Sequence, residues 1–194
     1  MVISTMKGVA ESDLMRSGSA WVEVVNGEMV EIDMGAAGFL HAIVIDNLRE
    51  ALKRNAVSNK LGYVLGDGLT YNLASGSEGI YTARIPDVSF LSKGRIPKDF
   101  DLKRPIPGAP DLAVEVMSPD DRAIDMQLKI EEYLNAGAQQ VWVLYPEQAT
   151  LHQYFRDDRS KVRVYRGTDT IDAEALFPGL KLTASELFIV PDLS

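Results

Sequence analysis

Two acidic residues stand where the surrounding sequence would leave a carboxylate without water. Glu115 lies inside the apolar run 111–117 (DLAVEVM), which has the pattern of a strand buried on both faces. Such a carboxylate persists only when it is paired with a cation, protonated or bound to a metal. Asp87 follows Pro86, a residue that suggests a strand start, an edge or a bulge. Hydrogen bonds to backbone amides or to an arginine are the structural alternative for each acid taken alone.

Lys129 is the third residue that could take part in chemistry. It lies three residues after Met126 and four before Tyr133, in a segment whose apolar residues recur at helical spacing, so its base borders the core. A lysine at such an edge commonly extends its ammonium to solvent, which is the alternative reading. However, the helix directly follows the Glu115 strand and could bring Lys129 near that strand's end. Two carboxylates and an ammonium suit a hard cation such as Mg²⁺ together with a phosphate.

The bulk composition restricts the classes of protein that are possible. A chain of 194 residues with 46% hydrophobic content predicts a single domain over 1–194. Without cysteine, any metal must have oxygen or histidine ligands. There is neither a secretory signal nor an apolar run of about 18 residues, so we expect a cytoplasmic protein without a membrane partner. The net charge of -8 argues against a nonspecific nucleic-acid coat protein. Segment 93–104, however, carries five basic and two acidic residues, so it could contact a nucleic-acid backbone or be a solvated loop.

The first half of the chain is expected to supply a short N-terminal helix, a hairpin, a long helix and several strands. Asn26-Gly27 favours a tight turn between strands at 20–25 and 28–33, which form the hairpin. Apolar residues at helical spacing predict a helix over 39–56. Strands arranged as a meander are then predicted at 61–65, 69–73 and 80–91, and the proline-rich stretch 92–110 should be irregular.

The second half is expected to position Glu115 and Lys129. Ser118 as N-cap and Pro119 at the first helical position predict a helix over 119–136. With strands at 111–117 and 140–145, this helix forms a unit of the size of a crossover between neighbouring strands. The remaining predictions are a hairpin with strands at 150–155 and 162–165 and a short helix with capping-box spacing at 183–186.

Several of these segments together resemble a known family. They are Pro86-Asp87, the run 111–119 (DLAVEVMSP), Lys129 four residues before Tyr133, Ala136-Gly137 and Val141-Trp142-Val143, with 23–28 (EVVNGE) and His41 upstream. Over about residues 20–155 the chain is similar to the Uma-two family of putative restriction endonucleases, within the PD-(D/E)XK nuclease superfamily. The resemblance implies an α/β (α+β mixed) fold with a restriction-endonuclease-like core, in which helices flank a central mixed β-sheet, with N-terminal and C-terminal hairpins.

The resemblance also implies site residues. Asp87 and Glu115 would be the metal ligands, and Lys129 would supply the lysine that the general motif places where this chain has Met117. His41 and Glu28 are further candidates for catalytic residues, and Glu23 on the preceding strand could be the inward-facing acid instead of Glu28.

The resulting hypothesis is a Mg²⁺- or Mn²⁺-dependent endonuclease acting on DNA. Asp87, Glu115 and a backbone carbonyl near Val116 would position the ion, and Lys129 would assist the attacking water or the phosphate. The alternatives are a noncatalytic nucleic-acid-binding or assembly module on the same fold and, less favoured, hydrolysis of a small phosphate ester. Homodimerisation is expected by analogy with related nucleases.

Overall fold

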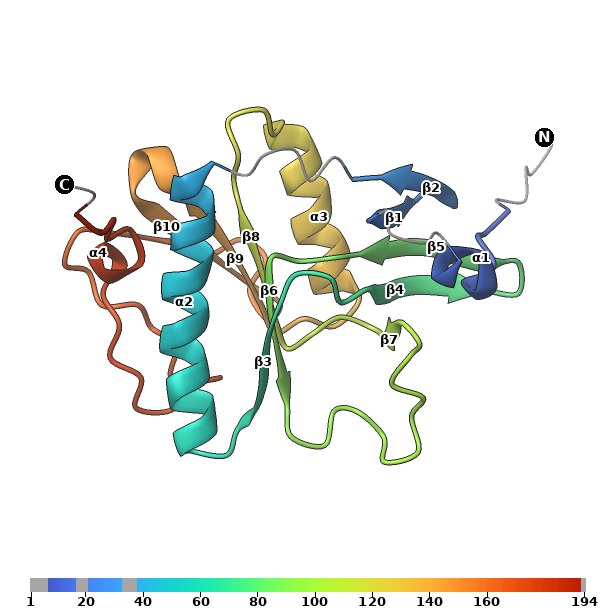
Figure 1. Cartoon of the computed structure of the whole chain (residues 1–194), viewed down its shortest axis with the longest axis horizontal. Helices are drawn as coiled ribbons and strands as arrows, with labels where there is room; N and C mark the ends of the chain where they lie inside the picture. Colours follow the sequence, from blue (N-terminus) through green and yellow to red (C-terminus); the bar gives the residue numbers. More distant parts are fainter. Residues whose placement is uncertain (1–6, 17–20, 33–37, 193–194) are drawn as a thin grey trace.

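The computed structural model describes residues 7–16, 21–32 and 38–192, which form two mixed β-sheets flanked by helices (Figure 1). The helices are α1 (Glu11–Met15), α2 (Phe39–Ser58), α3 (Ala123–Asn135), the 3-10 helix η1 (Pro146–Gln148) and α4 (Ala184–Leu187). The strands are β1 (Val22–Val25), β2 (Glu28–Glu31), β3 (Gly62–Gly66), β4 (Tyr71–Gly76), β5 (Gly79–Arg84), β6 (Val88–Ser92), β7 (Ile106–Pro107), β8 (Leu112–Val116), β9 (Gln140–Tyr145), β10 (Thr150–Phe155) and β11 (Val162–Arg166).

The strands divide between a six-stranded sheet, in the order β11-β10-β9-β8-β6-β3, and a five-stranded sheet, in the order β2-β1-β5-β4-β7. Neighbouring strands are antiparallel except for β8 with β9 and β4 with β7. The mixed α/β architecture with flanking helices is confirmed, and the strands form two sheets where the sequence indicated one central sheet. None of the helices in the described part of the chain is long and apolar enough to cross a membrane.

Strand β8 is the centre of the larger sheet, between β6 and β9, and every one of its residues is buried. Its side chains alternate between two cores, as the period of a strand requires. Val114 and Val116 pack in the core that includes α2, whereas Ala113 packs in the core that includes α3. Helices α2 and α3 therefore cover opposite faces of this sheet, and Glu115 points to the α3 face together with Ala113.

The prediction of one strand over 80–91 was wrong. The structure has β5 and β6 there, separated by Ile85-Pro86-Asp87, and the two strands belong to different sheets. A proline has no N–H to donate to a strand ladder, so the pairing stops at this point. The predicted meander was also wrong, because β3 pairs with β6 in the larger sheet while β4 pairs with β5 in the smaller one. Asp87 thus lies where the chain passes from one sheet to the other.

The helix predicted over 119–136 is shorter at its start. Helix α3 begins at Ala123 with Arg122 as its N-cap, so Ser118 does not cap it. The carboxylate of Asp121 instead accepts a hydrogen bond from the Ser118 N–H at 2.7 Å, and the Asp121 N–H donates to the Ser118 carbonyl at 3.1 Å. This local turn uses the residues that resembled a helix start. The crossover is confirmed, because β8 and β9 are parallel neighbours.

Strand β4 (Tyr71–Gly76) begins two residues later and ends three residues later than the strand predicted over 69–73. The other elements agree more closely with the sequence. In the N-terminal hairpin, Asn26 and Gly27 have positive φ angles of 51° and 81°, as a tight two-residue turn requires; positions 20 and 33 lie outside the described residues. The long helix extends to Ser58, and the hairpin of β10 and β11 forms as expected. Before α4, the Glu186 carboxylate accepts a hydrogen bond from the Thr183 N–H at 2.7 Å, which confirms the capping box. The irregular stretch 92–110 contains the two-residue strand β7.

Candidate active site

Asp87 lies at the point where β6 begins. Because Val88 is paired with Val114 in the adjacent strand, the next position along the ladder brings Asp87 beside Glu115. The Asp87 carboxylate accepts a hydrogen bond of 2.6 Å from the Val116 N–H. Burial raises the pKa of Asp87 to about 6, and the hydrogen bond and the charge of Lys129 only partly oppose this.

Glu115 is 4% exposed, and both of its carboxylate oxygens have a partner. The Tyr133 hydroxyl donates to Oε1 at 2.8 Å, and the Lys129 ammonium donates to Oε2 at 3.0 Å. Burial raises the pKa of Glu115 to about 7; Lys129 lowers the value, while the charges of Asp87 and Glu23 raise it further. Two adjacent carboxyls with raised pKa values are typical of a functional site.

Lys129 does not extend its ammonium to solvent. Its side chain is 22% exposed, and Nζ lies 3.0 Å from Glu115 Oε2 and 3.6 Å from Glu23 Oε1. Burial by itself would lower the pKa of Lys129, but attraction to the two carboxylates raises it above its usual value. The structure therefore brings Asp87, Glu115 and Lys129 together, with the ammonium charged and directed at the acids.

A second group of buried charges adjoins this trio. Glu23 Oε2 accepts a hydrogen bond from Arg84 Nη1 at 2.6 Å, and Glu23 Oε1 accepts one from the Ile85 N–H at 3.1 Å. Arg84 Nε donates to Glu132 at 2.6 Å. Glu23 and Arg84 are 4% and 5% exposed. Glu23 is thus the acid of the N-terminal hairpin that reaches the site, whereas Glu28 is exposed on β2.

Arg84, Glu132 and the hydroxyl of Tyr133 were not predicted from the sequence as site residues. Tyr133 carried a usable signal, because residues four apart on a helix share a face and Lys129 is four positions earlier. Glu132 is three positions after Lys129 and carried the same signal, although acids on helices are usually solvated. For Arg84 the sequence offers only its place before Ile85-Pro86, which indicates no partner.

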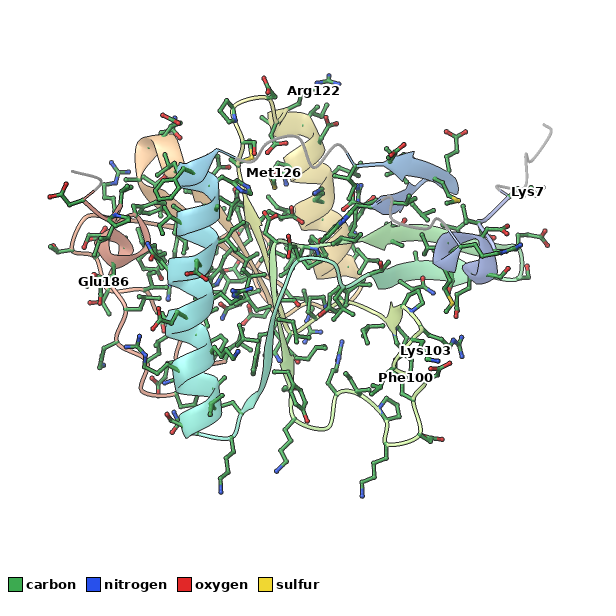
Figure 2. All side chains as sticks on the ribbon, in the orientation of Figure 1. Lys7, Phe100, Lys103, Arg122, Met126 and Glu186 are labelled. Atoms are coloured by element: carbon green, nitrogen blue, oxygen red, sulfur yellow. The ribbon has the colours of Figure 1, made fainter. Side chains whose placement is uncertain are left out.

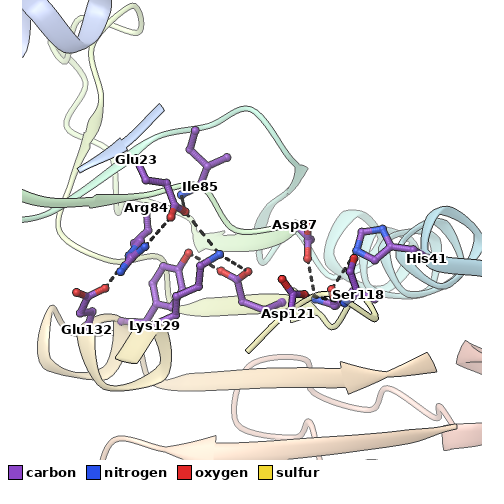
Figure 3. Close-up of polar contacts among 12 residues, drawn as sticks. Glu23, His41, Arg84, Ile85, Asp87, Ser118, Asp121, Lys129 and Glu132 are labelled. Atoms are coloured by element: carbon purple, nitrogen blue, oxygen red, sulfur yellow. Dashed lines mark hydrogen bonds and ion pairs between the residues drawn. The ribbon is translucent and has the colours of Figure 1, made fainter. Parts of the chain in front are cut away.

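His41, in the first turn of α2, approaches the same site from the other side of the strand end (Figure 3). Its Nε2 lies 3.0 Å from the Val116 carbonyl oxygen, which can only accept, so the imidazole donates this bond. Among the described residues, His41 Nδ1 is buried without a hydrogen-bond partner. Both backbone groups of Val116 are therefore held by candidate site residues, the N–H by Asp87 and the carbonyl by His41.

The oxygen atoms available to a metal ion here belong to the carboxylates of Asp87 and Glu115 and the carbonyl of Val116. No group of three or more His, Asp or Glu side chains in the described residues is arranged to hold an ion. Two carboxylates and one carbonyl are a sparse set, but Mg²⁺ characteristically retains several waters and binds substrate oxygens in addition to one or two carboxylates.

The basic segment 93–104 lies away from this site. Strand β6 runs from beside Asp87 to Ser92, so the segment leaves the sheet from the opposite end. Figure 2 shows Lys103 and Phe100 of this segment far from Arg122, which precedes α3 at the site end. Arg95 donates to a backbone carbonyl at 2.8 Å, and Arg104 pairs with an acid of α1 at 2.6 Å. The structure therefore gives no support to direct contact between this segment and a substrate at Asp87.

Comparison with known proteins places these features in a family. The model of the Uma2 family, described as "Putative restriction endonuclease", matches residues 13–185. Among solved structures, a putative nuclease belonging to DUF820 from Anabaena variabilis ATCC 29413 is similar with a TM-score of 0.75 and 17% sequence identity, over 93% of this chain and 97% of that chain. At that identity the likeness shows a shared fold. No protein with a curated description matches the sequence. Because the family match spans most of the chain, this protein belongs to the Uma2 family.

Proposed function

We propose that this protein is a metal-dependent endonuclease that hydrolyses phosphodiester bonds in DNA, with Asp87, Glu115 and the Val116 carbonyl holding Mg²⁺ or Mn²⁺. The observation that carries the proposal is the meeting of the buried carboxylate of Glu115 and the partly buried carboxylate of Asp87 beside the Lys129 ammonium. They lie at the end of a central strand, in a chain of a nuclease family. This arrangement joins anionic ligands for a cation to a positive group that can contact a phosphate.

The residues present fit a hard divalent cation. All the available ligand atoms are oxygens, which Mg²⁺ and Mn²⁺ prefer, and no cysteine is present to favour a softer metal. Burial raises the pKa values of Asp87 and Glu115, and repulsion from Asp87 raises that of Glu115 further. The positive charge of such an ion would offset both effects. A bound ion supplies Lewis-acid activation of water and of the phosphodiester.

The chain's own residues have distinct tasks in this proposal. Tyr133 holds Glu115 Oε1 and so would leave Oε2, which now accepts from Lys129, as the oxygen for the ion. His41 orients the Val116 carbonyl in the same way. The Lys129 ammonium donates hydrogen bonds either to the attacking water or to a nonbridging phosphate oxygen, where negative charge develops; a donor in such a position typically contributes about 10²–10³ in rate.

The test is cleavage of supercoiled plasmid DNA with Mg²⁺ or Mn²⁺. Asp87→Asn and Glu115→Gln should abolish cleavage, and Lys129→Ala should reduce it by roughly 10²–10³. Glu28→Gln, an exposed acid of β2, is the matched control and should cleave as the unaltered protein does. Absence of cleavage by the unaltered protein, together with an unchanged metal affinity in Glu115→Ala, would exclude the proposal.

One observation favours the noncatalytic alternative, a nucleic-acid-binding or assembly module. The Lys129 ammonium occupies Glu115 Oε2, the oxygen a metal would use. Titration calorimetry with Mn²⁺ separates the two functions, since the module needs no metal affinity at this position. Association into a homodimer and the choice of DNA as substrate stay predictions from the family resemblance.

A further inference from the structure

The Lys129 ammonium lies between the carboxylates of Glu115 and Glu23, and only Glu115 is a proposed metal ligand. Nζ is 3.0 Å from Glu115 Oε2 and 3.6 Å from Glu23 Oε1, so a short movement exchanges one partner for the other (Figure 3). Glu115 belongs to the proposed metal ligands, whereas Glu23 lies on β1 of the smaller sheet. Because a bound cation and the ammonium cannot share one carboxylate oxygen without strong repulsion, the two compete for Glu115.

Glu23 is fixed more firmly than a single ion pair requires. Its two carboxylate oxygens accept hydrogen bonds from Arg84 Nη1 at 2.6 Å and from the Ile85 N–H at 3.1 Å. Arg84 is itself held by Glu132 at 2.6 Å, and its side chain is 6% exposed. Arg84 immediately precedes the Ile85-Pro86-Asp87 connection between the sheets. The same contacts therefore hold Glu23 in place and fix the start of the segment that carries Asp87.

Lys129 needs both Glu23 and Glu115 as possible partners. Glu23, Glu115 and Glu132 are three buried or nearly buried carboxylates, and Arg84 and Lys129 are the two cations paired with them. If a divalent cation takes Glu115, the ammonium needs another buried anion, because a buried charge without a partner is strongly disfavoured. Glu23 is the acid within reach. Arg84 bonds Glu23 Oε2, so the other oxygen, Glu23 Oε1, stays directed at Lys129 Nζ.

From this geometry we propose that Glu23, held by Arg84, is a positioning residue that receives the Lys129 ammonium when a divalent cation occupies Glu115. The inference rests on the metal site of the proposed function. Glu23 keeps the lysine charged and beside the substrate in the metal-loaded protein, and it removes the lysine's competition for the ligand oxygen. Arg84 contributes by holding Glu23 in place.

The test is a double-mutant cycle on the dissociation constant for Mn²⁺, measured by titration calorimetry of the full chain. The cycle uses Glu23→Gln, Lys129→Met and the double variant. A nonadditive result means that the interaction between residues 23 and 129 changes when metal binds. We expect Glu23→Gln to weaken Mn²⁺ binding at least about fivefold more in the presence of Lys129 than in the Lys129→Met background.

Glu132→Gln is the matched control. It removes a carboxylate from the same cluster but not one that contacts Lys129, so its effect on Mn²⁺ affinity should be the same with and without Lys129→Met. If Glu23→Gln does not fold, Arg84→Lys replaces it. Lysine cannot make both of the arginine's bonds, so its cost should also depend on Lys129.

Each outcome of the cycle decides the inference. Equal effects of Glu23→Gln in both backgrounds would overturn it, because Glu23 would then act through its charge or the fold alone. Absence of Mn²⁺ binding to the unaltered protein would overturn both this inference and the metal site. Nonadditive Mn²⁺ binding without any DNA cleavage would support the role of Glu23 and refute the proposed nuclease function.

Discussion

Replacement of Arg84 by methionine tests whether paired buried charges hold the site together. Methionine preserves much of the side-chain volume but removes the arginine that pairs with Glu23 and Glu132, whose side chains are 6% and 15% exposed. Breaking a buried ion pair typically costs about 3–5 kcal/mol. Glu23 keeps the Ile85 N–H and Lys129 as partners, so we expect the lower end, about 3 kcal/mol.

The change should be measured as the free energy of unfolding in urea and as the midpoint of thermal unfolding. For a chain of this size, 3 kcal/mol corresponds to a fall in Tm of roughly 6–12 °C. Arg54→Met is the control, because Arg54 and Glu50 form an ion pair at 2.7 Å with side chains 74% and 70% exposed. That pair should contribute less than about 1 kcal/mol.

A second substitution provides an internal check on Arg84→Met. Adding Glu132→Leu removes one of the carboxylates that the first change leaves unpaired, so part of the lost stability should return. Two results would refute the reasoning that buried charge pairing stabilises the site. In the first, Arg84→Met lowers the free energy of unfolding no more than Arg54→Met does. In the second, the losses from Arg84→Met and Glu132→Leu simply add in the double variant.

Three further predictions concern the trio and its neighbours. Burial raises the Glu115 pKa from 4.5 to about 7, so between these pH values the folded protein binds more protons than the unfolded chain does. The free energy of unfolding in urea, measured without metal, should therefore fall as pH rises from 4.5 to about 7. In Glu115→Gln it should depend less on pH. Tyr133→Phe removes the 2.8 Å hydrogen bond to Glu115 and should lower the free energy of unfolding by about 1–3 kcal/mol, whereas no loss would mean that the bond is unimportant. His41→Ala should weaken Mn²⁺ binding by about tenfold or more in calorimetry, and an unchanged affinity would indicate that the Val116 carbonyl takes no part.

Local patterns predicted the elements wherever burial and period agreed. The continuous apolar run around Glu115 identified the central strand, since a strand covered by helices on both faces has no polar side. Asn26-Gly27 identified the hairpin turn, because both positions need positive φ. The errors occurred where two readings of a local pattern were available. Pro86 separates two strands, and the Ser118 segment forms its own turn before α3.

The sequence alone determined that Glu115 must have a partner, because no amount of packing removes the cost of a buried carboxylate. It also indicated which helix could supply Lys129, since the helix follows the strand directly. Only the tertiary structure decided that Glu23 and not Glu28 joins the site, and that Arg84 links Glu23 to Glu132. Glu23 and Arg84 are 61 positions apart on neighbouring strands of one sheet. Their contact depends on which strands become neighbours in the sheet, and the spacing of residues along the chain does not predict that pairing.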